Sequence, residues 1–510
     1  MTCDWPWPKS AARCCRWPSD GRFVARCASL RCRPKRRGRT FERAILPGSL
    51  EVVELKDIRP HLRPTLLLAY PVVLSQLGHT MVNFIDSVLV GRTGTVPLAA
   101  VSLGVSSTTV LMILGIGLSM GSVPLVAAAD GRRDLPELGR LLVASVWTNA
   151  LAGLVLAGLG QLVPYLLPWL GQPAEVVAQA GPWVQVISLS LFPLMVFQGF
   201  REFAEGLGLT RQAMWLSILA NVLNGLLCYM LVYGKWGAPE MGMMGSAWAT
   251  LLARTLMAAF MAAYVLRAKR LRDERAAVTS WLPAGATVRR VVDLGAPIGV
   301  QMALEVGAFG MSLLMAGWLG VTTEAAHKVA IDVASMTYMA ASGIAAAATI
   351  RVGNLRGAGN LWAARHAGFA AYWLTFGFMG VMAVLLISTR HVVPYVYISD
   401  PQVVEQAATL LLVAALFQVS DGLQVVGLGA LRGLEDVKVP SVVALLAYWA
   451  VALPLGYFLG FKLHLGAPGV WTGLLVGLTI VAVVLLVRFR RETEPEFAAT
   501  LPAAEEPVTV

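Results

Sequence analysis

Residues 297–320 read PIGVQMALEVGAFGMSLLMAGWLG, an apolar run whose one charged side chain is Glu305. A helix of about 20 apolar residues crosses the roughly 30 Å hydrocarbon core of a bilayer, so this run predicts a membrane-spanning helix. The rest of the chain has the same character, since 57% of its 510 residues are hydrophobic and only 14% are charged. This composition lies outside the range of soluble domains and predicts an integral membrane protein.

Apolar runs of this kind recur along the chain between clusters of glycine, proline and charged residues. Helix is the expected state of each run, because an open strand in lipid would leave backbone amides unsatisfied. The length of the runs and their lack of alternation do not fit a β-barrel. Twelve helical spans are expected, at about 65–90, 98–129, 138–166, 175–200, 212–233, 243–267, 294–319, 324–350, 362–389, 402–430, 439–461 and 468–487.

Lysine and arginine gather in alternate loops, after the second, fourth, sixth, eighth, tenth and twelfth spans. Loops rich in these residues stay on the cytoplasmic side, so both termini are expected in the cytoplasm, with the spans in the inner (plasma) membrane of the cell. This distribution accounts for the net charge of +11, because the basic residues are scattered over loops and form no single stripe. No nucleic-acid partner is expected.

The two ends of the chain differ from the spans in composition. Residues 1–60 are basic and hold five of the six cysteines, in a spacing that fits no standard zinc site. This segment is expected to be a disordered tail or a stretch translated from a misassigned start. The full expected division is a tail at 1–60, an N-lobe at 61–267, a basic cytoplasmic linker at 268–293, a C-lobe at 294–488 and a disordered tail at 489–510.

An internal repeat relates the two halves of the chain. Residues 71–94 and 297–320 both run from proline to glycine, and the same offset of 226 residues maps Gly117 onto Gly343 and Gly131 onto Gly357. The sequence therefore predicts an all-α membrane protein of twelve helices in two six-helix lobes. Each lobe begins and ends on the cytoplasmic side, an arrangement typical of transporters that expose their site alternately to the two sides of a membrane.

Acidic side chains within the spans are the candidate functional residues, since an ionisable group in lipid is costly to keep. Glu305 lies near the middle of the seventh span, and Asp421 lies deep in the tenth. Gln418, Asp421 and Gln424 follow one another at intervals of three and share one helix face, which is expected to point inward. Carboxylate and amide oxygens suit Na⁺, and a buried carboxyl could instead carry a proton, so Glu305 and Asp421 are the predicted cation site.

Two further acids have competing interpretations. Asp86 lies near the outer end of the first span and serves either proton or substrate coupling or an interfacial contact with Arg92. Asp332 follows Lys328 by one helical turn, and an ion pair between the two is the favoured interpretation. The residues considered as possible lining of a cavity are Asn224, Phe417, Gln418, Gln424 and Asp332.

No signature of catalysis is present. The sequence has no phosphate-binding loop and no His-Glu-x-x-His motif, so an enzyme is not expected and transport would draw on an ion gradient. No cofactor is expected beyond Na⁺ or H⁺ as the coupling ion. The expected partners are the lipid bilayer and small lipophilic cationic drugs or dyes, held by acids and aromatic rings, and the chain is expected to be a monomer.

Several motifs together resemble the multidrug and toxic-compound extrusion (MATE) family, in its bacterial NorM-like branch. They cover roughly residues 60 to 490, and they are NFIDSVLVG at 83–91, VYGK at 232–235, AAHKVA at 325–330, IRVGN at 350–354 and DGLQVV at 421–426. The resemblance implies two lobes in a V-shaped arrangement that exchange cationic drugs for Na⁺ or H⁺. It also implies a cation site at Glu305 and Asp421, and a role for Asp86 in protonation or substrate release.

The sequence departs from the family pattern at three positions. Phe417 stands where a tyrosine is frequent, Cys228 where an asparagine is frequent, and Asp332 where an amide is expected. The main alternative function is a lipid-linked oligosaccharide flippase of related architecture, which would be expected to line its cleft with basic residues. A membrane scaffold or receptor is a third interpretation, but it leaves Glu305 and Asp421 without a role.

Overall fold

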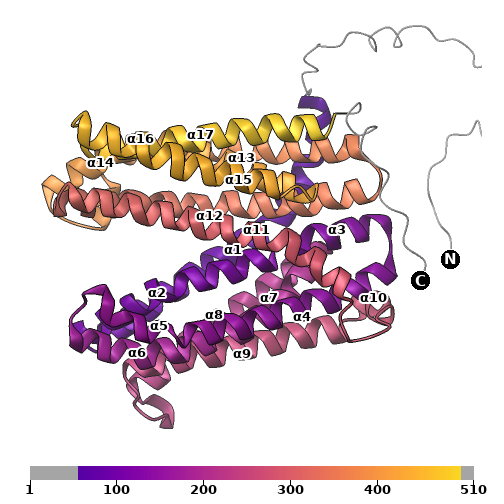
Figure 1. Cartoon of the computed structure of the whole chain (residues 1–510), viewed down its shortest axis with the longest axis horizontal. Coiled ribbons are helices and arrows are strands. Elements are labelled where there is room, and N and C mark those ends of the chain that lie inside the picture. Colours follow the sequence, from indigo (N-terminus) through magenta and orange to yellow (C-terminus); the bar gives the residue numbers. More distant parts are fainter. Residues whose placement is uncertain (1–54, 495–510) are drawn as a thin grey trace, which may run out of the picture. The chain divides into compact units, whose positions relative to one another are not determined.

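The computed structural model describes residues 55–494, apart from the side chains of residues 55, 79–85, 87 and 170. Within this part of the chain every regular element is a helix (Figure 1). The first half contains α1 (Leu55–Gly91), α2 (Thr95–Ser119), α3 (Ser122–Arg132), α4 (Leu135–Gly160), α5 (Val163–Leu166), η1 (Leu167–Leu170), α6 (Ala174–Leu189), α7 (Leu191–Gly206), α8 (Thr210–Tyr233), η2 (Lys235–Gly237) and α9 (Met243–Arg267). The second half contains η3 (Lys269–Leu271), α10 (Arg272–Ala276), α11 (Gly285–Trp318), α12 (Val321–Gly357), α13 (Leu361–Thr389), η4 (Val393–Val396), α14 (Pro401–Gly433), α15 (Lys438–Leu446), η5 (Ala447–Ala452), α16 (Leu453–Tyr457), η6 (Phe458–Lys462) and α17 (Gly466–Glu492).

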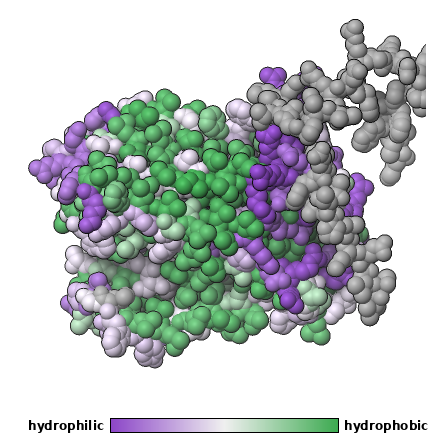
Figure 2. All heavy atoms as spheres, turned by 45° about the horizontal axis from the view of Figure 1, so that its top comes forward, coloured by the Kyte–Doolittle hydropathy of each residue, from purple (hydrophilic) through white to green (hydrophobic). Residues whose placement is uncertain are grey.

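Eleven of the helical stretches in residues 55–494 are long and apolar enough to cross a membrane. Four of them join shorter elements: α2 with α3, α4 with α5 and most of η1, α6 with α7, and α15 through to η6. Figure 2 shows a broad hydrophobic region on the visible face, with hydrophilic residues gathered toward its ends. This distribution is the one expected of a bundle that lies across a bilayer.

The first predicted span is not among the eleven. Helix α1 includes residues 79–85 and 87, whose side chains lie outside the described ones, and it runs for 37 residues, which is long enough to cross. It packs against α8 of the first half and against α12 and α13 of the second, so much of its surface faces protein. With α1 as the first, the twelve predicted spans and the two-lobed all-α fold are confirmed.

The predicted boundaries fall inside longer helices. Helix α11 begins at Gly285, within the segment predicted as a linker at 268–293, and α17 continues to Glu492, past the predicted start of a tail at 489. The first turns of α11 are amphipathic, with Thr287 and Val291 buried between exposed arginines, so hydropathy does not reveal them. Residues 55–60 of the predicted tail at 1–60 belong to the start of α1. Residues 1–54 of that tail and residues 495–510 of the other lie outside the described residues.

The repeat is visible in the packing of α3 against α12. A Cβ added at Gly131 would lie 2.0 Å from the Asn354 carbonyl oxygen, and one added at Gly357 would lie 2.1 Å from the Ala128 carbonyl oxygen. The offset of 226 residues that maps Gly131 onto Gly357 also maps Ala128 onto Asn354, so the two contacts are reciprocal. The Asn354 amide also donates to the Asp130 carboxylate at 2.7 Å. The two halves therefore meet, at the end predicted to be cytoplasmic, through a contact that only glycine permits.

One span of the second half departs from regular α-helix. Helices α15 and α16 are joined by the π-helical turn η5, directly before Pro454. Proline has no backbone N–H and its ring clashes with the carbonyl four residues earlier, so a wider turn relieves the conflict. This turn holds Tyr448, which is 2% exposed. A π-helical turn inside a helix is often found at a functional site.

Candidate functional site

Two helices of the second half supply the predicted acids. Glu305 lies on α11, and Asp421 lies on α14 with Gln418 and Gln424 one helical turn to either side. The exposed fractions of Gln418, Asp421 and Gln424 are 1%, 5% and 0%, so the prediction that this face points into the protein is confirmed. Glu305 is also buried, and its charge acts on Asp421. The structure therefore brings the two predicted cation-binding acids into one buried site.

Hydrogen-bond donors from three elements converge on the Glu305 carboxylate. Tyr448 Oη donates to Oε1 at 2.8 Å, and Gln424 Nε2 reaches the same oxygen at 3.2 Å. The second oxygen, Oε2, accepts from Gln301 Nε2 at 2.8 Å. An ionised carboxylate only accepts hydrogen bonds, so three donors favour the charged form of Glu305.

Arg432 forms a hydrogen bond with one of these donors, Gln301. Arg432 Nη2 donates to Gln301 Oε1 at 3.0 Å, while the other end of the same amide donates to Glu305. Arg432 is 7% exposed and lies near the end of α14, so its guanidinium sits within the protein and not in a loop. Gln301 thus links a buried cation to a buried anion.

Asp421 and Gln418 have the opposite character. Asp421 Oδ1 is buried without a hydrogen-bond partner among the described residues, and so are both amide atoms of Gln418. Leaving such groups without partners is costly, since a buried polar atom loses its hydration. These two side chains therefore offer oxygen ligands that the protein itself does not use.

Phe417 belongs to an aromatic cluster beside the site. Its ring centre lies 5.2 Å from that of Trp471 and 6.1 Å from that of Phe309, and Phe309 in turn contacts Tyr448 at 5.9 Å. Phe417 is 2% exposed, so it packs in the core next to Gln418. The cluster fixes the α14 face and the Tyr448 turn relative to α11.

The first half carries its own buried polar group around Asp86 on α1. The thiol of Cys228 hydrogen-bonds the Asp86 side chain, and the charge of Arg254 acts on the same carboxylate. Arg254 Nη1 also donates to Ser190 Oγ at 2.7 Å. Asn224 Nδ2 donates to Thr250 at 3.3 Å, while its Oδ1 has no partner among the described residues. Asp86 and Asn224 thus lie in the first half, on helices other than those that hold Glu305 and Asp421.

Asp332 is engaged at the surface. Lys328 Nζ forms an ion pair with its carboxylate one helical turn away, as the spacing predicted. The Lys328 side chain is 61% exposed and that of Asp332 is 34% exposed. Asp332 therefore has a partner of its own and does not join the buried site.

Three residues of the site were missed in the sequence. Gln301 precedes Glu305 by one turn and could have been found from that spacing. Arg432 falls just after the tenth predicted span at 402–430, so the sequence predicts it in a cytoplasmic loop, whereas α14 continues to Gly433. Tyr448 carries no signal, since its position depends on the π-helical turn at η5.

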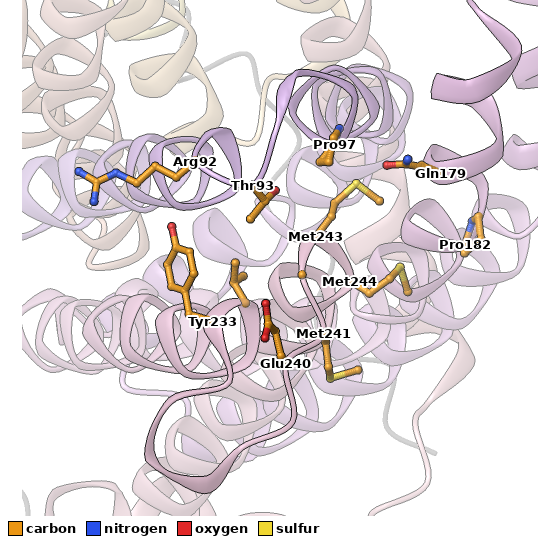
Figure 3. A pocket seen from close by; sticks show the side chains of 12 residues that line it. Arg92, Thr93, Pro97, Gln179, Pro182, Tyr233, Glu240, Met241, Met243 and Met244 are labelled. Atoms are coloured by element: carbon orange, nitrogen blue, oxygen red, sulfur yellow. The ribbon is translucent and has the colours of Figure 1, made fainter.

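A pocket of about 610 Å³ lies away from these acids, at the end of the first half opposite to the loops predicted to be cytoplasmic (Figure 3). It lies between the turn from α1 to α2, helix α6, the end of α8 and the start of α9. The residues that line it are Arg92, Thr93, Pro97, Gln179, Pro182, Val232, Tyr233, Glu240, Met241, Gly242, Met243 and Met244. Because it contains none of the predicted site residues, its size does not make it the cation site.

Comparisons with known proteins agree on one group of transporters. The MatE family model matches residues 71–230 and again 297–458, at the interval of the internal repeat. A probable multidrug resistance protein NorM of Rhodopseudomonas palustris is 36% identical over 464 residues, which cover 90% of this chain and 98% of that protein. The protein of the same description from Xylella fastidiosa is 34% identical over 436 residues, which cover 86% of this chain and 93% of that protein.

Solved structures resemble the fold over most of its length. A eukaryotic MATE transporter, AtDTX14, superposes with a TM-score of 0.77 at 22% identity, covering 87% of this chain and 100% of that one. A MATE protein in its straight conformation gives a TM-score of 0.78 at 20% identity, covering 87% of this chain and 99% of that one. Because both sequences are less than 25% identical to this chain, these superpositions show a shared fold.

Proposed function

The chain belongs to the MatE family, and from this premise we propose that it is a secondary active multidrug efflux antiporter, which exports lipophilic organic cations in exchange for Na⁺ or H⁺. One observation carries the proposal: two buried acids of the second half, Glu305 and Asp421, share a site in which Asp421 and Gln418 keep unpartnered oxygens. A buried carboxylate without a partner is costly unless a cation joins it. In a transporter, that cation is a natural coupling ion.

The coupling follows from a difference in affinity between two states. If the cation binds more tightly to one opening of the two lobes and the drug to the other, each ligand shifts the population toward its own state. Exchange then needs no other energy source than the cation gradient. The reciprocal contact of Gly131 and Gly357 between α3 and α12 is the place where the lobes would have to part on the cytoplasmic side.

Asp86 is proposed to act in the first lobe, in protonation or in release of the substrate. It lies beside Cys228 and Arg254, so a change in its charge would be felt by α8 and α9 at once. Acids and aromatic rings suit a lipophilic cation, which binds through charge and cation–π contacts. The proposal also includes both termini in the cytoplasm, a place in the inner (plasma) membrane, action as a monomer and no cofactor beyond the coupling ion.

A flippase for lipid-linked oligosaccharides would need basic side chains free to hold pyrophosphate. Two arginines of the spans are engaged: Arg254 donates to Ser190 and acts through its charge on Asp86, and Arg432 donates to Gln301. At the second-half site, the charged side chain with an unpartnered buried atom among the described residues is Asp421, whereas Arg432 donates to Gln301. The antiporter is therefore the function that the geometry favours.

Efflux from proteoliposomes tests the proposal. The purified protein is reconstituted with ethidium inside, and an inward Na⁺ gradient or an inward H⁺ gradient is imposed in separate runs. We expect one gradient to drive efflux and the Asp421→Asn variant to lose at least about tenfold in the driven rate, since a lost charge–ion contact costs on the order of 1.4 kcal/mol or more. Asp332→Asn is the matched control and is expected to transport like the wild type, because Asp332 is paired with Lys328 at the surface. Absence of efflux under both gradients would favour the flippase.

A further inference from the structure

The charges at the second-half site do not balance. Glu305, Asp421 and Arg432 are all buried, which leaves two carboxylates against one guanidinium. Among the described residues, these three are the charged groups that act on one another here, with the phenols of Tyr338 and Tyr448 beside them. The site therefore carries one uncompensated negative charge when both acids are ionised.

The two acids are not equivalent in their contacts. Both oxygens of Glu305 are occupied, by Tyr448 and Gln424 on one side and by Gln301 on the other. Asp421 has a buried oxygen with no partner, and Gln418, one turn before it on α14, has two unpartnered amide atoms. Either orientation of the Gln418 amide leaves its oxygen free, so this observation does not depend on how the amide is assigned.

The position of Arg432 explains the difference. Its guanidinium holds Gln301 by the oxygen, which turns the amide N–H₂ toward Glu305. A carboxylate that accepts three hydrogen bonds near a fixed cation is held in its charged form. Arg432 touches neither Asp421 nor Gln418 in any described hydrogen bond, so the remaining charge falls on Asp421.

We infer that Glu305 is the fixed anion of the site, held ionised by Arg432 through Gln301, and that Asp421 with Gln418 binds the transported cation, one monovalent ion at a time. This inference rests on the proposed antiport and adds its stoichiometry. Arg432 is thus a positioning residue that sets the number of ions. Exchange of one such ion for one monovalent organic cation moves no net charge across the membrane.

The first half supports the same count. Asp86 has one arginine, Arg254, whose charge acts on it, so the two formal charges balance, although Asp86 Oδ1 has no hydrogen-bond partner among the described residues. The uncompensated charge in this count therefore lies in the second half, and Asp86 keeps its proposed role in protonation or substrate release.

Charge variants at two positions test the inference in ethidium-loaded proteoliposomes with the membrane potential set by a potassium ionophore. At zero potential, a roughly tenfold cation gradient sustains a roughly tenfold ethidium gradient in one-to-one exchange and a roughly hundredfold one in two-to-one exchange. The wild type is expected to show the former, independent of the imposed potential. Arg432→Gln leaves two uncompensated charges and is expected to show the latter, with flux that now depends on the potential.

The double variant separates charge counting from simple damage. Glu305→Gln alone leaves no net charge at the site, so efflux should lose its cation dependence. Adding Arg432→Gln restores a single negative charge, and one-to-one coupling should return. If Glu305 itself held the transported ion, the double variant would stay uncoupled, and that result would overturn the inference.

Arg488→Gln is the matched control, since Arg488, on the last span, is paired with Asp436 of the turn after α14 and with Glu492 of its own helix. It should couple like the wild type.

Thermal stability of the full-length purified variants is a second measurement, which reports binding even where transport is lost. A ligand that binds the folded state raises its stability, so Na⁺ is added in one series and the pH is lowered in a parallel series. Stabilisation of the wild type and the double variant, but not of Glu305→Gln, is expected; equal stabilisation of all three contradicts the inference. If the wild type shows no driven efflux at all, the proposed antiport fails, which is a different outcome from coupled efflux with an unchanged stoichiometry.

Discussion

The Tyr448 hydroxyl group holds two side chains of the buried site in place. It donates to Glu305 Oε1 at 2.8 Å and lies 3.0 Å from Gln424 Nε2, so it closes a network across three helices. Hydrogen bonds to a charged group contribute about 1.5–3 kcal/mol, more than those between neutral groups. The negative charge of Glu305 thus depends on a residue that lies far from it in the sequence.

Replacing Tyr448 by Phe is expected to weaken cation-driven efflux by about tenfold or more at acidic pH, with a smaller loss at alkaline pH. The reason is that Glu305 loses one of its three donors, so its charged form is stabilised less and a proton competes better. The measurement is the initial rate of ethidium efflux across a series of symmetric pH values. Tyr457→Phe, an exposed tyrosine in the same span, should follow the wild-type profile, and an identical profile for Tyr448→Phe would count against the network.

At the scale of helices, the wide turn η5 is the feature that puts Tyr448 on Glu305. Regular α-helix would turn each residue by about 100° relative to the one before, so losing the extra residue of the π-turn would carry Tyr448 off the site. Pro454 follows the turn and prevents regular hydrogen bonding there. Pro454 therefore maintains the wide turn η5, and η5 in turn places Tyr448 against Glu305.

Pro454→Ala is expected to keep the fold and lower coupled efflux, because alanine restores an N–H and allows the α-helix to continue through residues 447–452. Efflux and thermal stability are measured on the same preparation. Pro401→Ala, at the first position of α14, is the control, since proline there removes only a donor that would be unpaired anyway. Lower stability together with unchanged coupling would show that η5 matters for packing and not for the site.

The elements also show what could be predicted from the sequence and what could not. Long apolar runs predicted the helices well, because hydrocarbon allows little else. Their ends were missed where α11 and α17 extend beyond the apolar stretch, since amphipathic turns outside lipid leave no hydropathy signal. The inward face of Gln418, Asp421 and Gln424 followed from helical spacing. The partners Arg432 and Tyr448 did not, because contacts across helices depend on tertiary packing.

For the molecule as a whole, the internal repeat relates the two halves of the chain to each other. The offset of 226 residues that relates the starts of the two halves also relates Gly131 to Gly357, and each of these glycines meets the backbone of the opposite half. Backbone carbonyls cannot move aside as a side-chain end can. The contact between α3 and α12 is therefore all-or-none, as a closure between two lobes needs to be.

Gly131→Ala is expected to abolish most driven efflux, because its Cβ would fall 2.0 Å from the Asn354 carbonyl oxygen and keep the halves apart. Overpacking of this kind costs on the order of 1–3 kcal/mol, so thermal stability should fall as well. Gly310→Ala on α11, where a Cβ meets nothing within 4 Å, is the control. Wild-type efflux from Gly131→Ala would mean that this contact need not close during transport.

The account depends on a single uncompensated charge at Glu305, Asp421 and Arg432. The most direct test is the ethidium gradient that a fixed cation gradient sustains at zero potential, compared between Glu305→Gln and Glu305→Gln with Arg432→Gln. We predict that coupling is lost in the single variant and returns one-to-one in the double variant. Coupling that stays lost in the double variant, in protein that is folded and reconstituted, would contradict the account.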